Sequence, residues 1–185
     1  MPGKMPGMRI VAGRWGSRLL STPAGVETRP TSDRVREALF SILGERVEGA
    51  RVLDLFAGSG ALGLEALSRG AREATFVDSA EPAIRALRVN LEALGAEAVV
   101  HRADARAFLQ TARAEARQYD LVFLDPPYRM AARLGRELSE ALPAVLAPRS
   151  LVVSESDRRS PLALDLPLTD ERRYGDTLIR LHEPR

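Results

Sequence analysis

The stretch RVLDLFAGSGALGLEA, residues 51–66, joins two structural patterns and decides how the rest of the chain is interpreted. Its apolar first half has the length of a buried strand, and its second half has the spacing of a helix packed on a core. Gly58, Gly60 and Gly63 follow the spacing G-x-G-x-x-G. This spacing provides a tight turn, close approach of the backbone to a ligand, and close packing of the helix on the strand. In the order strand, turn and helix it favours a nucleotide-type cofactor site.

Segments of the two kinds alternate on both sides of this stretch. Strands are expected at 50–58, 73–78, 96–104, 119–124 and 150–156, and helices at 30–43, 60–71, 81–95, 105–118 and about 130–146. Two hairpins are also expected, one over 8–23 with turn glycines Gly13 and Gly16, and one over 168–183 with Gly175. This alternation predicts an α/β fold with a mostly parallel, doubly wound sheet and right-handed crossovers.

The helix expected at 30–43 has its own start signal and apolar stripe. Thr31 or Ser32 is the expected cap, because a hydroxyl oxygen accepts hydrogen bonds from first-turn amides. The expected stripe consists of Val35, Leu39, Ile42 and Leu43.

Composition limits the kind of protein and the available chemistry. The chain has 185 residues, 45% hydrophobic and 28% charged, which is typical of one main globular domain. Within it, residues 1–36 form a basic arm with the first hairpin and the start of the first helix, and residues 37–185 form the α/β domain. No run of about 18 apolar residues and no signal sequence is present, so a cytoplasmic protein is expected. The chain has no cysteine and two histidines, which excludes disulfides and thiolate catalysis and argues against a metal site.

Positive charge is concentrated near the amino terminus. Residues 1–36 hold seven basic and two acidic side chains, although the whole chain carries a net charge of only +2. Such an excess is a candidate contact for nucleic-acid phosphates, and a solvated arm is the alternative interpretation.

Three acidic residues end three successive predicted strands and suggest the charge of the cofactor. Asp54 precedes the glycine turn and would repel the pyrophosphate that a dinucleotide places at a helix amino terminus. A cofactor with a cationic amino-acid end would instead be attracted, and S-adenosylmethionine is such a molecule. Asp78, 20 residues after Gly58, is placed to accept hydrogen bonds from ribose hydroxyls. Asp104, with the amide of Ala105, is placed to bind the adenine edge.

Two neighbouring residues complete the predicted cofactor site, namely Phe56 and Ser79. Each of the three acids, taken separately, can also be explained as a helix cap. Three acids at three consecutive strand ends fit one ligand lying across the sheet better than three unrelated caps.

The fourth strand stops abruptly in FLDPPYR, residues 123–129. Pro126 and Pro127 have no amide hydrogen and cannot continue a central strand. The chain therefore leaves the sheet stiffly at a carboxyl end, which is the edge where open α/β sheets bind their ligands.

Taken together, these motifs resemble a known family. DLFAGSGALGLEA, FVD, AD and DPPY, in this order and spacing, resemble class I methyltransferases that act on exocyclic amino groups. TRPTSDRVREALFSIL, GSGALGLEALSRGA and RRYGDT narrow the similarity to the bacterial 16S rRNA guanine-N2 methyltransferases of the RsmD type, from about Met8 to Leu181. The resemblance implies a Rossmann-like, seven-stranded methyltransferase domain over 37–185. It also implies S-adenosylmethionine as cofactor, with S-adenosylhomocysteine as its product.

The DPPY motif supplies the groups that an aryl amine needs for methylation. The Asp125 carboxylate and the Pro126 carbonyl oxygen can each accept one amino hydrogen and so orient the nitrogen. Pro127 stiffens the loop, and Tyr128 offers a face on which the base stacks. The target base must be unpaired or flipped out of a duplex.

The resemblance also implies RNA partners and RNA contacts. We expect 16S rRNA as substrate, within an assembled or assembling 30S subunit, no membrane association, and a monomer. The predicted RNA-binding residues are Arg14, Arg18, Arg29, Thr31, Arg34 and Arg36.

Three alternatives remain open on the sequence. A DNA adenine-N6 methyltransferase would use the same motif, but the chain has no room for a separate domain that reads sequence. A nicotinamide oxidoreductase would use the glycine turn, but Asp54 counts against it. A non-catalytic RNA-binding module would leave the DPPY geometry unexplained.

Overall fold

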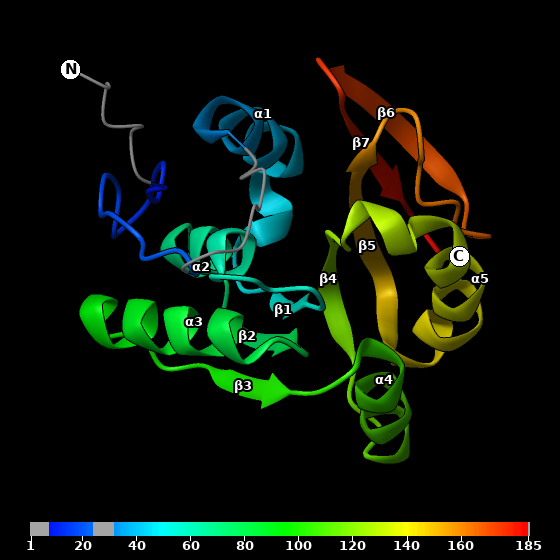
Figure 1. Ribbon diagram of the computed structural model, residues 1–185, viewed down its shortest axis with the longest axis horizontal. Coiled ribbons are helices and arrows are strands. Elements are labelled where there is room, and N and C mark those ends of the chain that lie inside the picture. Colours follow the sequence, from blue (N-terminus) through cyan, green and yellow to red (C-terminus); the bar gives the residue numbers. More distant parts are fainter. Residues whose placement is uncertain (1–7, 24–31, 185) are drawn as a thin grey trace.

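A seven-stranded sheet forms the centre of the molecule (Figure 1). The computed structural model describes residues 8–23 and 32–184. The sheet has the order β3-β2-β1-β4-β5-β7-β6. Its strands are β1 (Arg51–Asp54), β2 (Glu73–Asp78), β3 (Val99–Arg102), β4 (Tyr119–Leu124), β5 (Leu146–Asp157), β6 (Leu168–Tyr174) and β7 (Thr177–His182). β1 to β5 are parallel, whereas β7 pairs antiparallel with both β5 and β6.

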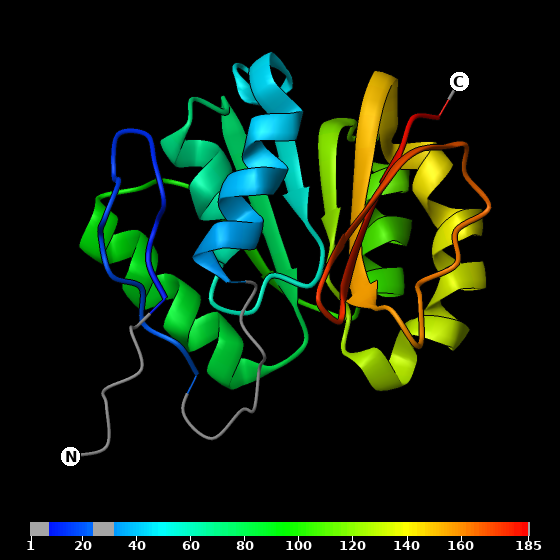
Figure 2. The same cartoon turned by 90° about the horizontal axis from the view of Figure 1, so that it is seen from above.

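Helices cover both faces of the sheet, as Figure 2 shows. The α-helices are α1 (Asp33–Leu43), α2 (Ala61–Ser68), α3 (Glu81–Leu94), α4 (Ala105–Ala114) and α5 (Ala131–Ala141). Short 3-10 turns lie at Gly44–Val47, Tyr128–Met130 and Leu142–Val145. One apolar core packs α1, α2 and α3 on one face, and a second packs α4 and α5 on the other. The predicted doubly wound α/β fold with a carboxyl-terminal antiparallel hairpin is therefore confirmed.

The strand order reverses between β1 and β4, which places the site. From β1 the chain proceeds through β2 to β3 in one direction, and from β4 to β5 in the other. Asp54 pairs with Phe123, so the carboxyl ends of β1 and β4 lie side by side. Open α/β sheets bind ligands outside the strand ends at such a reversal.

The amino-terminal hairpin forms, but not as two regular strands. Met8 and Leu20 are joined by a backbone hydrogen bond, and so are Ile10 and Arg18, but only Arg9 and Leu19 form a β-bridge. Side chains of α2 bind three other amides of this segment. The Glu65 carboxylate accepts from Val11 N at 2.7 Å and Ala12 N at 3.0 Å, and Ser68 Oγ accepts from Trp15 N at 3.0 Å. The hairpin is thus fastened to a helix instead of extending a sheet.

Two further details differ from the sequence expectations. The cap of α1 is Ser32, whose hydroxyl accepts from Val35 N at 3.3 Å, and Thr31 lies outside the described residues. Ile42, expected in the apolar stripe, is 37% exposed, whereas Phe40 is buried with its ring 5.8 Å from that of Phe123. The buried face of α1 therefore includes Phe40 in place of the predicted Ile42.

The segment expected as one helix over about 130–146 is divided. α5 ends at Ala141, and a 3-10 turn containing Pro143 follows, since proline cannot donate the next helical hydrogen bond. β5 then begins at Leu146 rather than at Ser150. In the described ranges 8–23 and 32–184, none of the helices has the length and apolar character that a bilayer crossing requires.

Candidate active site

Asp54 brings a buried negative charge to the point where the strand order reverses. It ends β1, is 1% exposed, and its Oδ2 accepts a hydrogen bond from Gly63 N at 3.0 Å. Burial, supported by the nearby charge of Asp78, raises the pKa of Asp54 to about 7, although the Gly63 amide acts in the opposite direction. A cationic ligand group placed here would relieve this cost by stabilising the ionised carboxylate.

The glycine turn connects Asp54 to Asp78 at the end of β2. Gly58 N donates to Asp78 Oδ2 and Ala80 N donates to Asp78 Oδ1, both at 2.8 Å. Gly58 has a φ of +55°, and a Cβ built on it would face open space, so its backbone borders room for a ligand. A Cβ on Gly63 would lie 2.3 Å from Phe76 Cε1, so this glycine allows α2 to pack closely on β2. The turn is therefore open on one side and tightly packed on the other.

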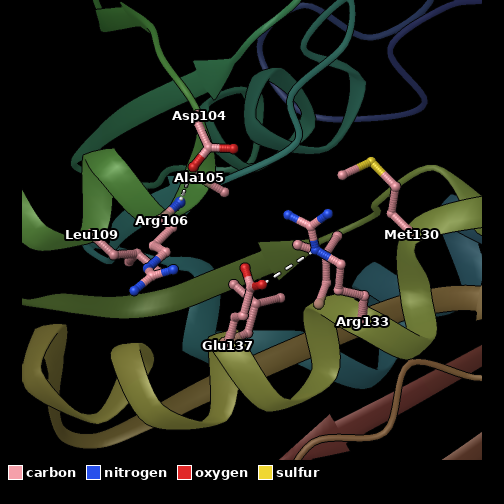
Figure 3. A pocket seen from close by; sticks show the side chains of 9 residues that line it. Asp104, Ala105, Arg106, Leu109, Met130, Arg133 and Glu137 are labelled. Carbon is pink, nitrogen blue, oxygen red and sulfur yellow. Dashed lines mark hydrogen bonds and ion pairs between the residues drawn. The ribbon is translucent and has the colours of Figure 1, made fainter.

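Asp104 caps α4 and borders a cavity. Its Oδ1 accepts from Arg106 N at 2.9 Å and Ala107 N at 3.3 Å, so the helix-cap interpretation is correct for this acid. Figure 3 shows its other carboxylate oxygen turned away from these bonds. A cavity of about 260 Å³ lies beside it, with Asp104 and Ala105 on one side and Met130 and Arg133 on the other (Figure 3). Asp104 can therefore cap the helix and contact a ligand.

The DPPY loop leaves β4 next to Asp54. Burial, together with the negative charges of Glu155 and Asp54, raises the pKa of Asp125 well above its ordinary range. Pro126 is buried, and Met130 N donates to the Pro127 carbonyl oxygen at 2.9 Å. Within the described residues, no backbone amide donates to the Pro126 carbonyl oxygen. Asp125 and this carbonyl group are thus available as acceptors, while the side chain of Tyr128 lies outside what the structure describes.

The remaining predicted cofactor residues differ in exposure. Phe56 is partly buried and packs against the core shared by α4 and α5. Ser79 is exposed, and the residue that precedes α3 as its cap is Ala80. Ser79 directly follows β2 and Phe56 lies two residues after β1, on the same edge as Asp54 and Asp78.

The predicted RNA-binding arginines lie in different places. Arg34 is exposed in the first turn of α1, and Figure 2 shows this helix starting at the edge towards which the parallel strands point. Arg14 and Arg18 are exposed on the hairpin, where Arg14 N donates to the carbonyl oxygen of Ser68, the last residue of α2. The hairpin tip therefore lies at the carboxyl end of α2, whereas the glycine turn lies at its amino end. Arg29, with Thr31, lies outside the described residues.

Arg36 requires a correction. Its side chain is 0% exposed, and its Nη2 donates to Asp33 Oδ1 at 2.6 Å and to the carbonyl oxygen of Arg9. Arg36 follows Val35 on the buried side of α1, which carries its guanidinium inwards. A buried guanidinium does not contact an RNA backbone from this position, so the prediction of Arg36 as an RNA-binding residue is wrong for this structure.

Sequence reasoning missed two buried polar residues near the site. Glu155, in β5, is 3% exposed, and its negative charge contributes, after burial, to the raised pKa of Asp125. Asn90, in α3, is 2% exposed and connects the base of the hairpin to the glycine turn. Its Nδ2 donates to the carbonyl oxygens of Ser21 and Ser59, both at 2.9 Å, and its Oδ1 accepts from Ser21 N at 2.7 Å. An acid near the end of the fifth predicted strand was a readable signal for Glu155, whereas nothing local marks Asn90.

The residues at this edge fit S-adenosylmethionine. The buried carboxylate of Asp54 suits a cationic amino-acid end, and the open side of Gly58 leaves room for it. Asp78 retains lone pairs for ribose hydroxyls beyond its two amide bonds. Asp104 and Ala105 border the neighbouring cavity. A pyrophosphate would be repelled at the same place.

Comparison with known proteins agrees with this geometry. The chain matches the family model described as Conserved hypothetical protein 95 over residues 8–183. Ribosomal RNA small subunit methyltransferase D of Haemophilus influenzae is 33% identical over 187 residues, which cover 95% of this chain and 93% of that protein. The protein of the same name from Escherichia coli K12 is 44% identical over 123 residues, 66% of this chain and 61% of that protein.

A solved structure shares the whole architecture. The hypothetical protein TTHA0928 of Thermus thermophilus has a TM-score of 0.82 and 36% identity, covering 95% of this chain and 98% of that chain. The chain therefore belongs to the family described as Conserved hypothetical protein 95, the RsmD-type S-adenosylmethionine-dependent methyltransferases.

Proposed function

We propose that the protein transfers a methyl group from S-adenosylmethionine to the N2 amino group of a guanine in 16S rRNA. The observation that carries this proposal is the position of Asp125 and Pro126 beside Asp54, where the strand order reverses. An acceptor pair for an amine is thereby adjacent to the carboxylate that suits a cationic cofactor.

The chain's own groups bind, orient and shield the reactants. When bound, S-adenosylmethionine supplies an electrophilic methyl group on a sulfonium. Asp125 and the Pro126 carbonyl oxygen each accept one hydrogen from the target amine, which directs the nitrogen lone pair. The two prolines hold this carbonyl group in place before substrate binds, so little reorganisation is needed during the reaction. Tyr128 is proposed to stack on the base.

Small-subunit RNA is proposed as the substrate because of the relatives. Two of them are named for methylation of small-subunit ribosomal RNA. The choice of guanine N2 rests on the motif resemblance found in the sequence. A 30S particle as substrate and a monomeric enzyme belong to the same proposal.

Labelled cofactor tests the proposal. The protein is incubated with methyl-labelled S-adenosylmethionine and either naked 16S rRNA or 30S subunits from a strain lacking the enzyme. Digestion to nucleosides should place the label in N2-methylguanosine. Label in N6-methyladenosine, or binding of NAD in place of S-adenosylmethionine, would contradict the proposal.

A variant of the DPPY loop completes the test. Asp125→Ala should reduce methyl transfer by about 100-fold or more, because one preorganised acceptor is lost. Glu73→Gln is the matched control, because Glu73 is an exposed acid at the opposite end of β2. Full activity of a folded Asp125→Ala protein would remove Asp125 from the mechanism.

A further inference from the structure

Glu155 lies beside Asp125 at the carboxyl edge of the sheet. Leu124 of β4 pairs with Ser154 of β5, and the two strands are parallel. The next residue of each strand is an acid, Asp125 in one and Glu155 in the other. Glu155 is 3% exposed and Asp125 is half-buried, so the two acids occupy adjacent positions at a largely buried part of this edge.

The charged groups around Glu155 come from several elements. Asp125 follows β4 and Asp54 ends β1, and both add negative charge. From α1, the buried guanidinium of Arg36 interacts favourably with Glu155. On β7 the partner of Glu155 is Ile179, which has no charge. The next residue of β7, Arg180, donates to Glu171 of β6 at 2.9 Å.

Arg36 supplies buried positive charge on the same side of the sheet as these acids. Its Nη2 is bound to Asp33, and within the described residues its Nε and Nη1 have no hydrogen-bond partner. Glu65, another acid that interacts with Arg36, already accepts from two hairpin amides and from Arg69 Nε at 2.7 Å. The buried guanidinium of Arg36 therefore supplies positive charge that interacts favourably with Glu155.

Methylation of an amine releases one proton, and its destination matters. The nitrogen lone pair forms the new N–CH₃ bond, and the S–CH₃ bond breaks with its electron pair staying on sulfur. An N–H bond then breaks, its pair returns to nitrogen, and the proton moves to a carboxylate oxygen. A carboxylate accepts this proton best when its proton affinity is raised towards neutrality.

We propose that Glu155 is a positioning residue for methyl transfer. Its buried negative charge, which interacts favourably with Arg36, makes Asp125 the acceptor of the proton that leaves the target amine. Glu155 touches neither cofactor nor base in this role and acts through Asp125. Burial raises the pKa of Asp125, and the like charge of Glu155 raises it further. The proposal rests on the proposed function of the site.

Titration of Asp125 tests the inference without requiring activity. The carboxyl carbon of Asp125 is followed by ¹³C NMR from pH 4 to 10 and assigned by its loss in Asp125→Asn. Glu155→Gln should lower the apparent pKa of Asp125 by about one unit or more, because the like charge is removed. Glu155→Asp should retain most of the shift, and the exposed control Glu73→Gln should leave it unchanged. An unchanged Asp125 titration in Glu155→Gln would overturn the proposal.

The pH profile of methyl transfer provides the second readout. In Glu155→Gln, the acidic limb of kcat should move to lower pH by about one unit and the plateau should fall about tenfold, with an unchanged KM for RNA. Rescue by Glu155→Asp is expected, and equal loss in both variants would contradict a role of charge. If neither naked RNA nor 30S subunits accept methyl, the proposed function fails, while the NMR titration still decides the Glu155–Asp125 relation.

Discussion

Among single side chains, Asp54 shows how a binding site reduces stability. Its pKa rises from an ordinary 3.8 to about 7 because the folded chain buries it. Between these two values the folded state binds more protons than the unfolded state, so the free energy of unfolding falls as pH rises from about 4 to about 7. Without cofactor, the buried charge of Asp54 therefore lowers the free energy of unfolding at neutral pH. A cationic ligand bound beside Asp54 removes this loss.

Asp54→Asn should separate stability from binding. The amide keeps an acceptor for Gly63 N but has no charge to bury. Urea unfolding should find the variant more stable than the parent by about 1 to 3 kcal/mol at pH 8 and nearly equal at pH 4. Calorimetry should find at least about tenfold weaker binding of S-adenosylmethionine, because a charge-assisted contact is lost. Equal stabilisation at both pH values would exclude proton linkage at Asp54.

Gly63 is a second residue with a measurable role. A Cβ there would meet Phe76, which is 0% exposed and has nowhere to move. Alanine favours a helix by about 1 kcal/mol, but overpacking costs about 1 to 3 kcal/mol, so Gly63→Ala should destabilise the protein. Chemical denaturation checks this, and the double variant Gly63→Ala, Phe76→Leu should recover part of the loss. Additive losses would show that the two side chains do not clash.

At the level of structural elements, the side chain of Asn90 connects the base of the hairpin to the glycine turn by hydrogen bonds. Asn90→Ala removes three hydrogen bonds from buried groups and should cost about 1 to 3 kcal/mol of unfolding free energy. The affinity for S-adenosylmethionine should fall as well, because Ser59 lies within the turn. Val89→Ala is the control, since Val89 lies on the same helix and is 51% exposed. Destabilisation with unchanged cofactor affinity would show that the glycine turn keeps its shape without the hydrogen bonds of Asn90.

Elements with strong local signals were predictable from the sequence. β2 and β4 have the expected bounds, because each apolar run stops at an acid. The end of α5 was missed, although Pro143 marks it, because the apolar pattern continues past it. The irregular hairpin was not predictable, because its amides bind Glu65 and Ser68, which lie more than fifty residues away.

For the molecule as a whole, the positions of the charged side chains say more about function than the net charge does. The acids predicted at the strand ends gather at one edge, because parallel strands in one sheet end together. The burial of Arg36, which brings its charge near Glu155, was not predictable, because helical spacing does not fix how α1 rotates against the sheet. Arg14 and Arg18 remain predicted RNA contacts, at a distance from the glycine turn.

The double variant Arg14→Ala, Arg18→Ala tests that surface. Contacts with phosphates far from the reaction contribute equally to substrate and transition-state binding, so KM for RNA should rise and kcat should stay unchanged. The salt dependence of RNA binding should weaken by about one unit of slope for each lost contact. An unchanged KM and slope would restrict the RNA surface to the edge near Arg34.

A crystal structure of the protein with S-adenosylmethionine is the most direct test of the account. We predict the amino-acid end of the cofactor beside Asp54 and Gly58, its ribose at Asp78 and its adenine at Asp104. Its methyl group should face Asp125 and the Pro126 carbonyl oxygen. A cofactor bound away from this edge, or one whose methyl group points away from these two acceptors, would contradict the account.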